Sequence, residues 1–145
     1  MLRTVGRIVL GAFLIGAGFG HFANADAFLA QVPPWMPAPE AVVAISGVVE
    51  LILGAALILS PQRFRPAIGW IVAAFFVVIF PGNISQFITG TDAFGLDSDA
   101  ARFVRLLFQP VLVIWAVWCT RAIELIRRRQ SEPETPSPRS PGHSS

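Results

Sequence analysis

The sequence predicts an all-α integral membrane protein, a four-helix bundle followed by a disordered C-terminal tail. Its 145 residues are 54% hydrophobic and only 14% charged, with a mean hydropathy of +0.62, whereas a soluble domain carries roughly 25% charged residues. A lipid-facing surface accounts for the missing charge. Four apolar stretches approach the length of about 20 residues with which a helix crosses a bilayer. They occupy residues 4–22, 41–59, 66–87 and 100–125.

The first stretch has two interpretations. Arg3 and Arg7 precede an apolar run, and Ala23-Asn24-Ala25 matches the small-residue cleavage site of a secretory signal peptide. However, the stretch is long enough to span a membrane, and three remaining helices would make a poorer bundle. We therefore favour an uncleaved first helix and keep signal-peptide cleavage as the alternative.

Prolines and apolar residues characterise the connection that follows and the next two helices. Four prolines within 31–39 force an extended backbone. The second helix shows no polar stripe beyond Glu50, which argues against a soluble bundle. The third reaches spanning length only if it continues through Pro81, which membrane helices tolerate.

The fourth helix is expected to begin at an N-cap, for which Asp97 or Asp99 is suited, and to extend beyond the membrane. The four-helix domain thus covers 1–129. Residues 130–145 are rich in Ser, Pro, Glu and Arg and offer no apolar side chain to bury, which predicts a disordered tail.

Arginine placement predicts the topology, because basic residues concentrate on the cytoplasmic side. With both termini in the cytoplasm, nine of the eleven arginines lie inside, and only Arg102 and Arg105 open the fourth helix outside. The expected location is the inner (cytoplasmic) membrane of a bacterial cell, with several passes through the bilayer. The arginines form no basic face, so nucleic acid is excluded as a partner.

The sequence also excludes several redox and metal sites. Cys119 is the only cysteine, which rules out an intrachain disulfide, a CxxC pair and a cysteine zinc site. The only histidines are His21 and His143, the second in the tail, so no bis-histidine haem and no metal site is expected. No covalently bound cofactor is predicted.

Polar residues within spanning helices are costly and indicate function by default. With the predicted topology, several converge on the outer half of the bundle, and Glu50 lies about 15 Å deep beneath them. These candidate ligand-binding residues are His21, Glu50, Asn83, Arg105 and Gln109.

Two prolines sharpen this hypothesis, since Pro81 and Pro110 leave the carbonyls of Val77 and Leu106 without their helical donors. Kinked helices beside polar side chains can line a small cavity. In the structural alternative, Glu50 and Arg105 form an ion pair, and the amides serve as hydrogen-bond links between helices.

These residues form a pattern that resembles a known family. His21-Phe22 ends the first helix, and Ser46-Gly47-x-x-Glu50 lies in the second. Phe80-Pro81-x-Asn83 ends the third, and Arg105-x-x-x-Gln109 opens the fourth, with Trp115 further on. Over residues 3–122 the chain resembles the DoxX-like family of small four-helix bacterial membrane proteins. It departs from that pattern in the fourth helix, where a proline is expected between the arginine and the glutamine and instead follows the glutamine.

The resemblance implies two functions. Some DoxX-like proteins are subunits of a quinone-reducing thiosulfate oxidoreductase or partners in membrane oxidoreductase complexes, and more distant relatives act in eukaryotic cargo export or receptor assembly. We expect an accessory subunit of a membrane redox complex that binds quinone, with the lipid bilayer and a membrane or redox protein as partners. The alternative is a non-catalytic scaffold or assembly factor. The sequence leaves open whether the chain is catalytic.

Overall fold

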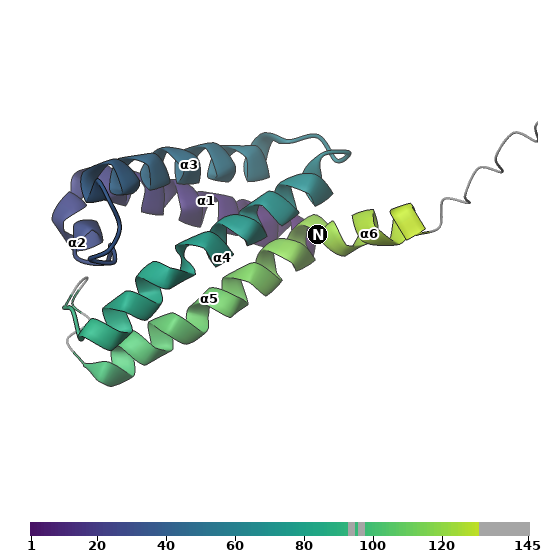
Figure 1. The fold of residues 1–145 in the computed structure, drawn as a ribbon. Coiled ribbons are helices and arrows are strands. Elements are labelled where there is room, and N and C mark those ends of the chain that lie inside the picture. The colour runs from purple at the N-terminus through teal and green to yellow at the C-terminus, as the bar shows by residue number, and fades with distance from the viewer. Residues whose placement is uncertain (93–94, 96–97, 131–145) are drawn as a thin grey trace, which may run out of the picture.

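The computed structural model describes residues 1–92, 95 and 98–130, and within these residues every regular element is a helix. The four long helices are α1 (Leu2–Ala23), α3 (Pro39–Leu59), α4 (Arg65–Thr89) and α5 (Asp99–Thr120), each long and apolar enough to cross a membrane. Successive long helices run in opposite directions (Figure 1). The predicted membrane four-helix bundle is confirmed. The predicted tail, apart from Gln130, lies outside the described residues.

Two short helices were not anticipated as separate elements. α2 (Ala25–Leu29) follows α1 directly, and α6 (Ala122–Gln130) follows α5. The fourth helix predicted over 100–125 is divided at Arg121, whose φ of 59° places it in the left-handed region and ends α5. This conformation interrupts the helical hydrogen bonding, so α6 leaves the bundle as a separate helix (Figure 1).

Local residues determine how far α4 extends and where α5 begins. α4 continues through Pro81 to Thr89 as one helix, which gives it the spanning length that the sequence required. The predicted N-cap of α5 at Asp97 or Asp99 is wrong. Ser98 takes that position, and its hydroxyl accepts a hydrogen bond from the Ala101 N–H at 3.3 Å. Asp99 becomes the first helical residue, where its negative charge favours the helix N-terminus.

The bundle consists of two antiparallel pairs, since α1 packs chiefly on α3 and α4 chiefly on α5. Glycines allow the α1 and α3 backbones to touch. A Cβ added at Gly54 would lie 2.6 Å from the carbonyl oxygen of Gly11, and one at Gly18 would lie 2.8 Å from that of Gly47. The two contacts are two helical turns apart, so these glycines allow the two helices to pack closely along their length.

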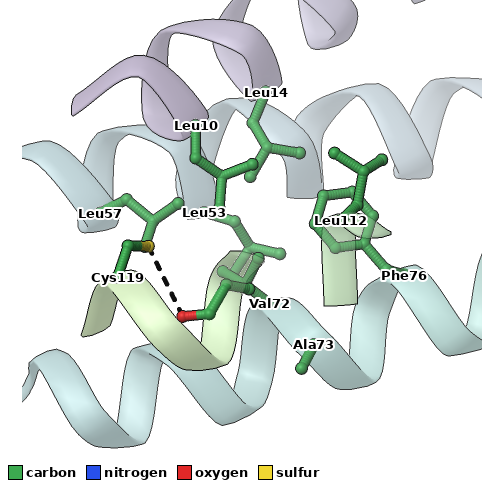
Figure 2. Close-up of a cluster of buried hydrophobic side chains, with 10 residues drawn as sticks. Leu10, Leu14, Leu53, Leu57, Val72, Ala73, Phe76, Leu112 and Cys119 are labelled. Carbon is green, nitrogen blue, oxygen red and sulfur yellow. Dashed lines mark hydrogen bonds between the residues drawn. The ribbon is translucent and has the colours of Figure 1, made fainter. Parts of the chain in front are cut away.

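The apolar core lies where the two pairs meet (Figure 2). Leucines from the first pair of helices meet one phenylalanine, one leucine and smaller side chains from the second. The buried cluster consists of Leu10, Leu14, Leu53, Leu57, Val72, Ala73, Phe76, Leu112, Ala116 and Cys119. The Cys119 thiol donates to the Ala116 carbonyl of its own helix at 3.6 Å, so it is a packing residue.

Most of each spanning helix faces outward. Only about a third or less of each apolar window is buried inside the bundle, and large apolar side chains are exposed along every long helix. Patches of this extent are rare on soluble monomers. The protein is therefore a multi-pass membrane protein whose outward apolar surface contacts lipid.

The glycine contacts yield the first prediction. In Gly54→Ala the new Cβ would meet backbone and side-chain atoms of α1, so the free energy of unfolding should fall by about 1–3 kcal/mol. Gly16→Ala is the matched control, because no heavy atom lies within 4 Å of a Cβ at that position. Thermal melts in detergent, followed by circular dichroism, compare the two. Equal melting temperatures would contradict the close packing of α1 on α3.

Candidate functional site

A cavity of about 460 Å³ lies between the two helix pairs at the end of the bundle that carries α2. All five residues that the sequence predicted as ligand-binding line it: His21 from α1, Glu50 from α3, Asn83 from α4, and Arg105 and Gln109 from α5. Apolar side chains supply most of the remaining wall. The cavity thus combines an apolar enclosure with a few polar groups, which is typical of sites for small organic molecules.

His21 and Glu50 form a buried pair on the α1–α3 side of the cavity. The Nδ1 atom of His21 lies 2.9 Å from the Val43 carbonyl oxygen. Because a carbonyl can only accept, Nδ1 carries a proton. His21 Nε2 then faces Glu50 Oε2 at 3.3 Å. This contact is within ion-pair distance but lacks hydrogen-bond geometry.

The ring of His21 is also held from the other side. Phe28 of α2 stacks on it with the ring centroids 3.7 Å apart. The short helix α2 therefore covers the histidine and keeps its imidazole plane in place. This explains why His21, at the end of a spanning helix, is buried.

Arg105 connects the fourth spanning helix to the proline-rich connection. Its Nη2 donates to Gln31 Oε1 at 2.9 Å, and its Nε donates to Asn83 Oδ1 at 3.4 Å. The planar guanidinium thus orients two amide side chains at once. Gln31 lies between α2 and α3, so this contact also brings the connection over the cavity.

The two amides predicted on α4 and α5 bond to each other. Asn83 Nδ2 donates to Gln109 Oε1 at 2.9 Å, and Gln109 Nε2 donates to the Phe76 carbonyl at 2.6 Å. The sequence predicted a free carbonyl at Val77, and the acceptor is the residue before it. Because Pro81 lacks an N–H and its ring crowds the preceding turn, carbonyls of that turn can accept bonds from outside the helix.

The ion pair between Glu50 and Arg105, which the structural alternative assumed, does not occur among the described residues. Glu50 Oε2 instead lies 3.3 Å from His21 Nε2, and Arg105 bonds to amide oxygens. The two residues nevertheless line the same cavity from opposite helix pairs. The sequence placed both at the correct end of the bundle but could not tell which neighbour each would reach.

Two buried polar atoms on this cavity have no hydrogen-bond partner among the described residues. They are Gln31 Nε2, which is a donor, and Glu50 Oε2, whose contact with His21 lacks hydrogen-bond geometry. An unmade hydrogen bond in a buried place costs roughly 1–3 kcal/mol. Both residues line the cavity, so a molecule held there can complete their bonding.

Sequence reasoning missed Gln31 and Phe28 as site residues. Both belong to the segment between the first two spanning helices, and nothing in their spacing distinguishes them from other loop residues. The available signal was the run of prolines after Gln31, which indicates an ordered connection. As for metals, no group of three or more His, Cys, Asp or Glu that could hold an ion occurs in the described part of the chain.

The amide contact between α4 and α5 yields the second prediction. In a double-mutant cycle, Asn83→Ala and Gln109→Ala should show a coupling energy of about 0.5–2 kcal/mol, because each removes the partner of the other. A cycle of Asn83→Ala with Gln86→Ala is the control, since Gln86 donates to the Thr91 carbonyl instead. Unfolding in detergent measures both cycles, and equal coupling in the two would contradict the assigned contact.

Comparison with known proteins gives one family. The chain matches the family described as "Domain of unknown function (DUF8561)" over residues 10–120. This range takes in most of α1, all of α3, α4 and α5, and every predicted site residue. Neither a curated protein nor a solved structure matches the chain. Because the match covers well over half of the 145 residues, the chain belongs to the DUF8561 family.

Proposed function

We propose that this protein binds a quinone-like lipophilic ligand in the cavity at its α2 end and serves as an accessory subunit of a membrane redox complex. The observation that carries the proposal is the pair of buried, unpartnered polar atoms, Gln31 Nε2 and Glu50 Oε2, on the wall of a mainly apolar cavity. A ligand that is apolar over most of its surface would match that wall if one oxygen accepts from Gln31 Nε2 and a hydroxyl donates to Glu50 Oε2, as the quinol form of a quinone can. The resemblance to the DoxX-like family supports the same ligand class.

The side chains suit a molecule with carbonyl oxygens. Arg105 and the Gln31 amide are donors on one side of the cavity, and the His21–Glu50 pair lies on another wall. A quinone carbonyl accepts hydrogen bonds from such donors. Hydrogen bonds to charged groups contribute about 1.5–3 kcal/mol, so Arg105 is the residue on which affinity should depend most.

Reduction of a quinone to a quinol takes two electrons and two protons. In this proposal His21 or Glu50 on the cavity wall would donate a proton to a ligand oxygen, and the other member of the pair, 3.3 Å away, would help to replace it. The electrons would come from a partner protein, in keeping with the role of an accessory subunit. We place the cavity in the outer half of the cytoplasmic membrane, with both chain termini in the cytoplasm, because the arginines favour that orientation.

A second function is favoured by the hydrogen bonds themselves. The bonds from Asn83 to Gln109 and from Gln109 to the Phe76 carbonyl link α4 to α5, and that from His21 to the Val43 carbonyl links α1 to α3. Such bonds stabilise membrane bundles without any ligand. The competing proposal is therefore a non-catalytic scaffold or assembly factor in which the polar cluster fixes the helix arrangement.

The third prediction separates these functions. Protein purified in mild detergent should carry a stoichiometric quinone, detected by native mass spectrometry and by lipid extraction. Arg105→Ala should lower the affinity for added ubiquinone by roughly tenfold or more, because it removes a charged donor. Circular dichroism should show that the helical content is kept.

The matched control is Arg102→Ala, which removes the same charge from the same helix. Arg102 is buried but bonds to Asp92 and Asp99 and does not line the cavity. It should keep the ligand. If wild type never carries or binds a quinone and Arg105→Ala only lowers the melting temperature, the ligand proposal is wrong and the scaffold proposal stands.

A further inference from the structure

A second cavity, of about 670 Å³, lies at the opposite end of the bundle, where the start of α1, the turn between α3 and α4, and the start of α6 come together. Its described lining is strongly basic, with five arginines and one glutamate. These residues are Arg3, Arg7, Arg63, Arg65, Arg121 and Glu124. The sequence predicted no basic face among the arginines, but the fold brings five of them together here.

Arg7 is the innermost of these arginines and is only 4% exposed. Its Nη1 donates to the carbonyls of Leu57 and Ile58 in the last turn of α3, where carbonyls lack helical partners. Both of its hydrogen bonds within the described residues use Nη1. Nη2 and Nε are therefore available to a ligand in the cavity.

The positive charges are only partly neutralised. Glu124 Oε1 lies 3.9 Å from Arg3 Nη1 and 3.5 Å from Arg121 Nε. The side chains of both arginines are about half exposed. Within the described residues no carboxylate forms an ion pair with Arg7, Arg63 or Arg65. Arg7 and Arg65 moreover line the same cavity, and their like charges repel each other. An anion between them would relieve this repulsion.

The cavity also has an apolar rim. Leu2 and Trp118 line it and are 73% and 39% exposed, so they offer apolar surface at its edge. Tryptophan is enriched where hydrocarbon meets the headgroup region. A ligand with an anionic head and hydrocarbon chains would contact the arginines and the rim together.

We propose that this cavity binds the phosphate-bearing headgroup of an anionic phospholipid from the adjoining leaflet, with its acyl chains lying on the outward apolar surface. The guanidinium fork matches a phosphate in geometry and charge. Basic pockets between helices on the cytoplasmic side take such headgroups, and the arginine distribution favours the cytoplasm for this end. The site is separate from the quinone cavity, so either proposal can fail alone.

The test uses the full-length protein in detergent, titrated with phosphatidylglycerol or phosphatidylcholine and read by native mass spectrometry. Phosphatidylglycerol should bind at least about tenfold more tightly. Arg63→Gln and Arg65→Gln should each weaken that binding about fivefold, as expected for one basic residue near an anionic headgroup. Arg63 is exposed, and Arg65 makes one hydrogen bond to the Ser60 carbonyl at 3.3 Å without being buried as Arg7 is, so both variants should fold.

Arg127→Gln is the control, because Arg127 is exposed on α6 and does not line the cavity. It removes the same charge and should change the affinity by less than about twofold. Equal binding of the two lipids, or an equal loss in Arg127→Gln, would overturn the proposal. Displacement of phosphatidylglycerol by excess inorganic phosphate would assign the cavity to soluble phosphate and would also overturn the lipid assignment.

Discussion

The arrangement depends on one constraint: a polar group at membrane depth needs a partner inside the protein, because hydrocarbon offers none. The helix backbones meet this need within themselves, and the polar side chains meet most of it by bonding between helices. His21 joins α1 to α3, and Asn83 with Gln109 joins α4 to α5. Two of the buried side chains whose hydrogen bonding is incomplete, Gln31 and Glu50, line the cavity at the α2 end. We therefore interpret the cavity as a site in which a ligand supplies the missing hydrogen-bond partners.

The two ends of the bundle carry cavities of different chemical character. At one end, arginines bond the last carbonyls of α3 and its following residue and surround a basic cavity. At the other end, α2 and the proline-rich connection cover a mainly apolar cavity with few polar groups. The glycine contacts keep α1 and α3 in direct apposition between these ends. The same helix bundle would then bind a lipid headgroup at the first end and a lipophilic ligand at the second.

The sequence predicted the fold and the side chains that line the cavity more completely than it predicted the contacts between those side chains. Hydropathy and length were sufficient for the four spanning helices, and the antiparallel order placed His21, Glu50, Asn83, Arg105 and Gln109 at one end. The partners of these residues depend on side-chain reach and helix rotation, which spacing does not determine. Glu50 therefore meets His21 rather than Arg105. Gln31 was missed because its role arises from the folding of a connection over the cavity, and the break at Arg121 arises from one left-handed residue.

The most direct test of the central claim is photoaffinity labelling of the membrane-embedded protein with an azido-quinone, followed by peptide mapping. The account predicts that the label concentrates on the cavity wall, in the connection from Phe28 to Met36 and around Phe108, and that excess unlabelled quinone removes it. Labelling spread along lipid-facing residues such as Ile71 and Ile114, which are exposed and do not line the cavity, would reflect quinone dissolved in the bilayer. If that pattern persisted without competition, the cavity would not be a quinone site, and the polar cluster would be a purely structural element.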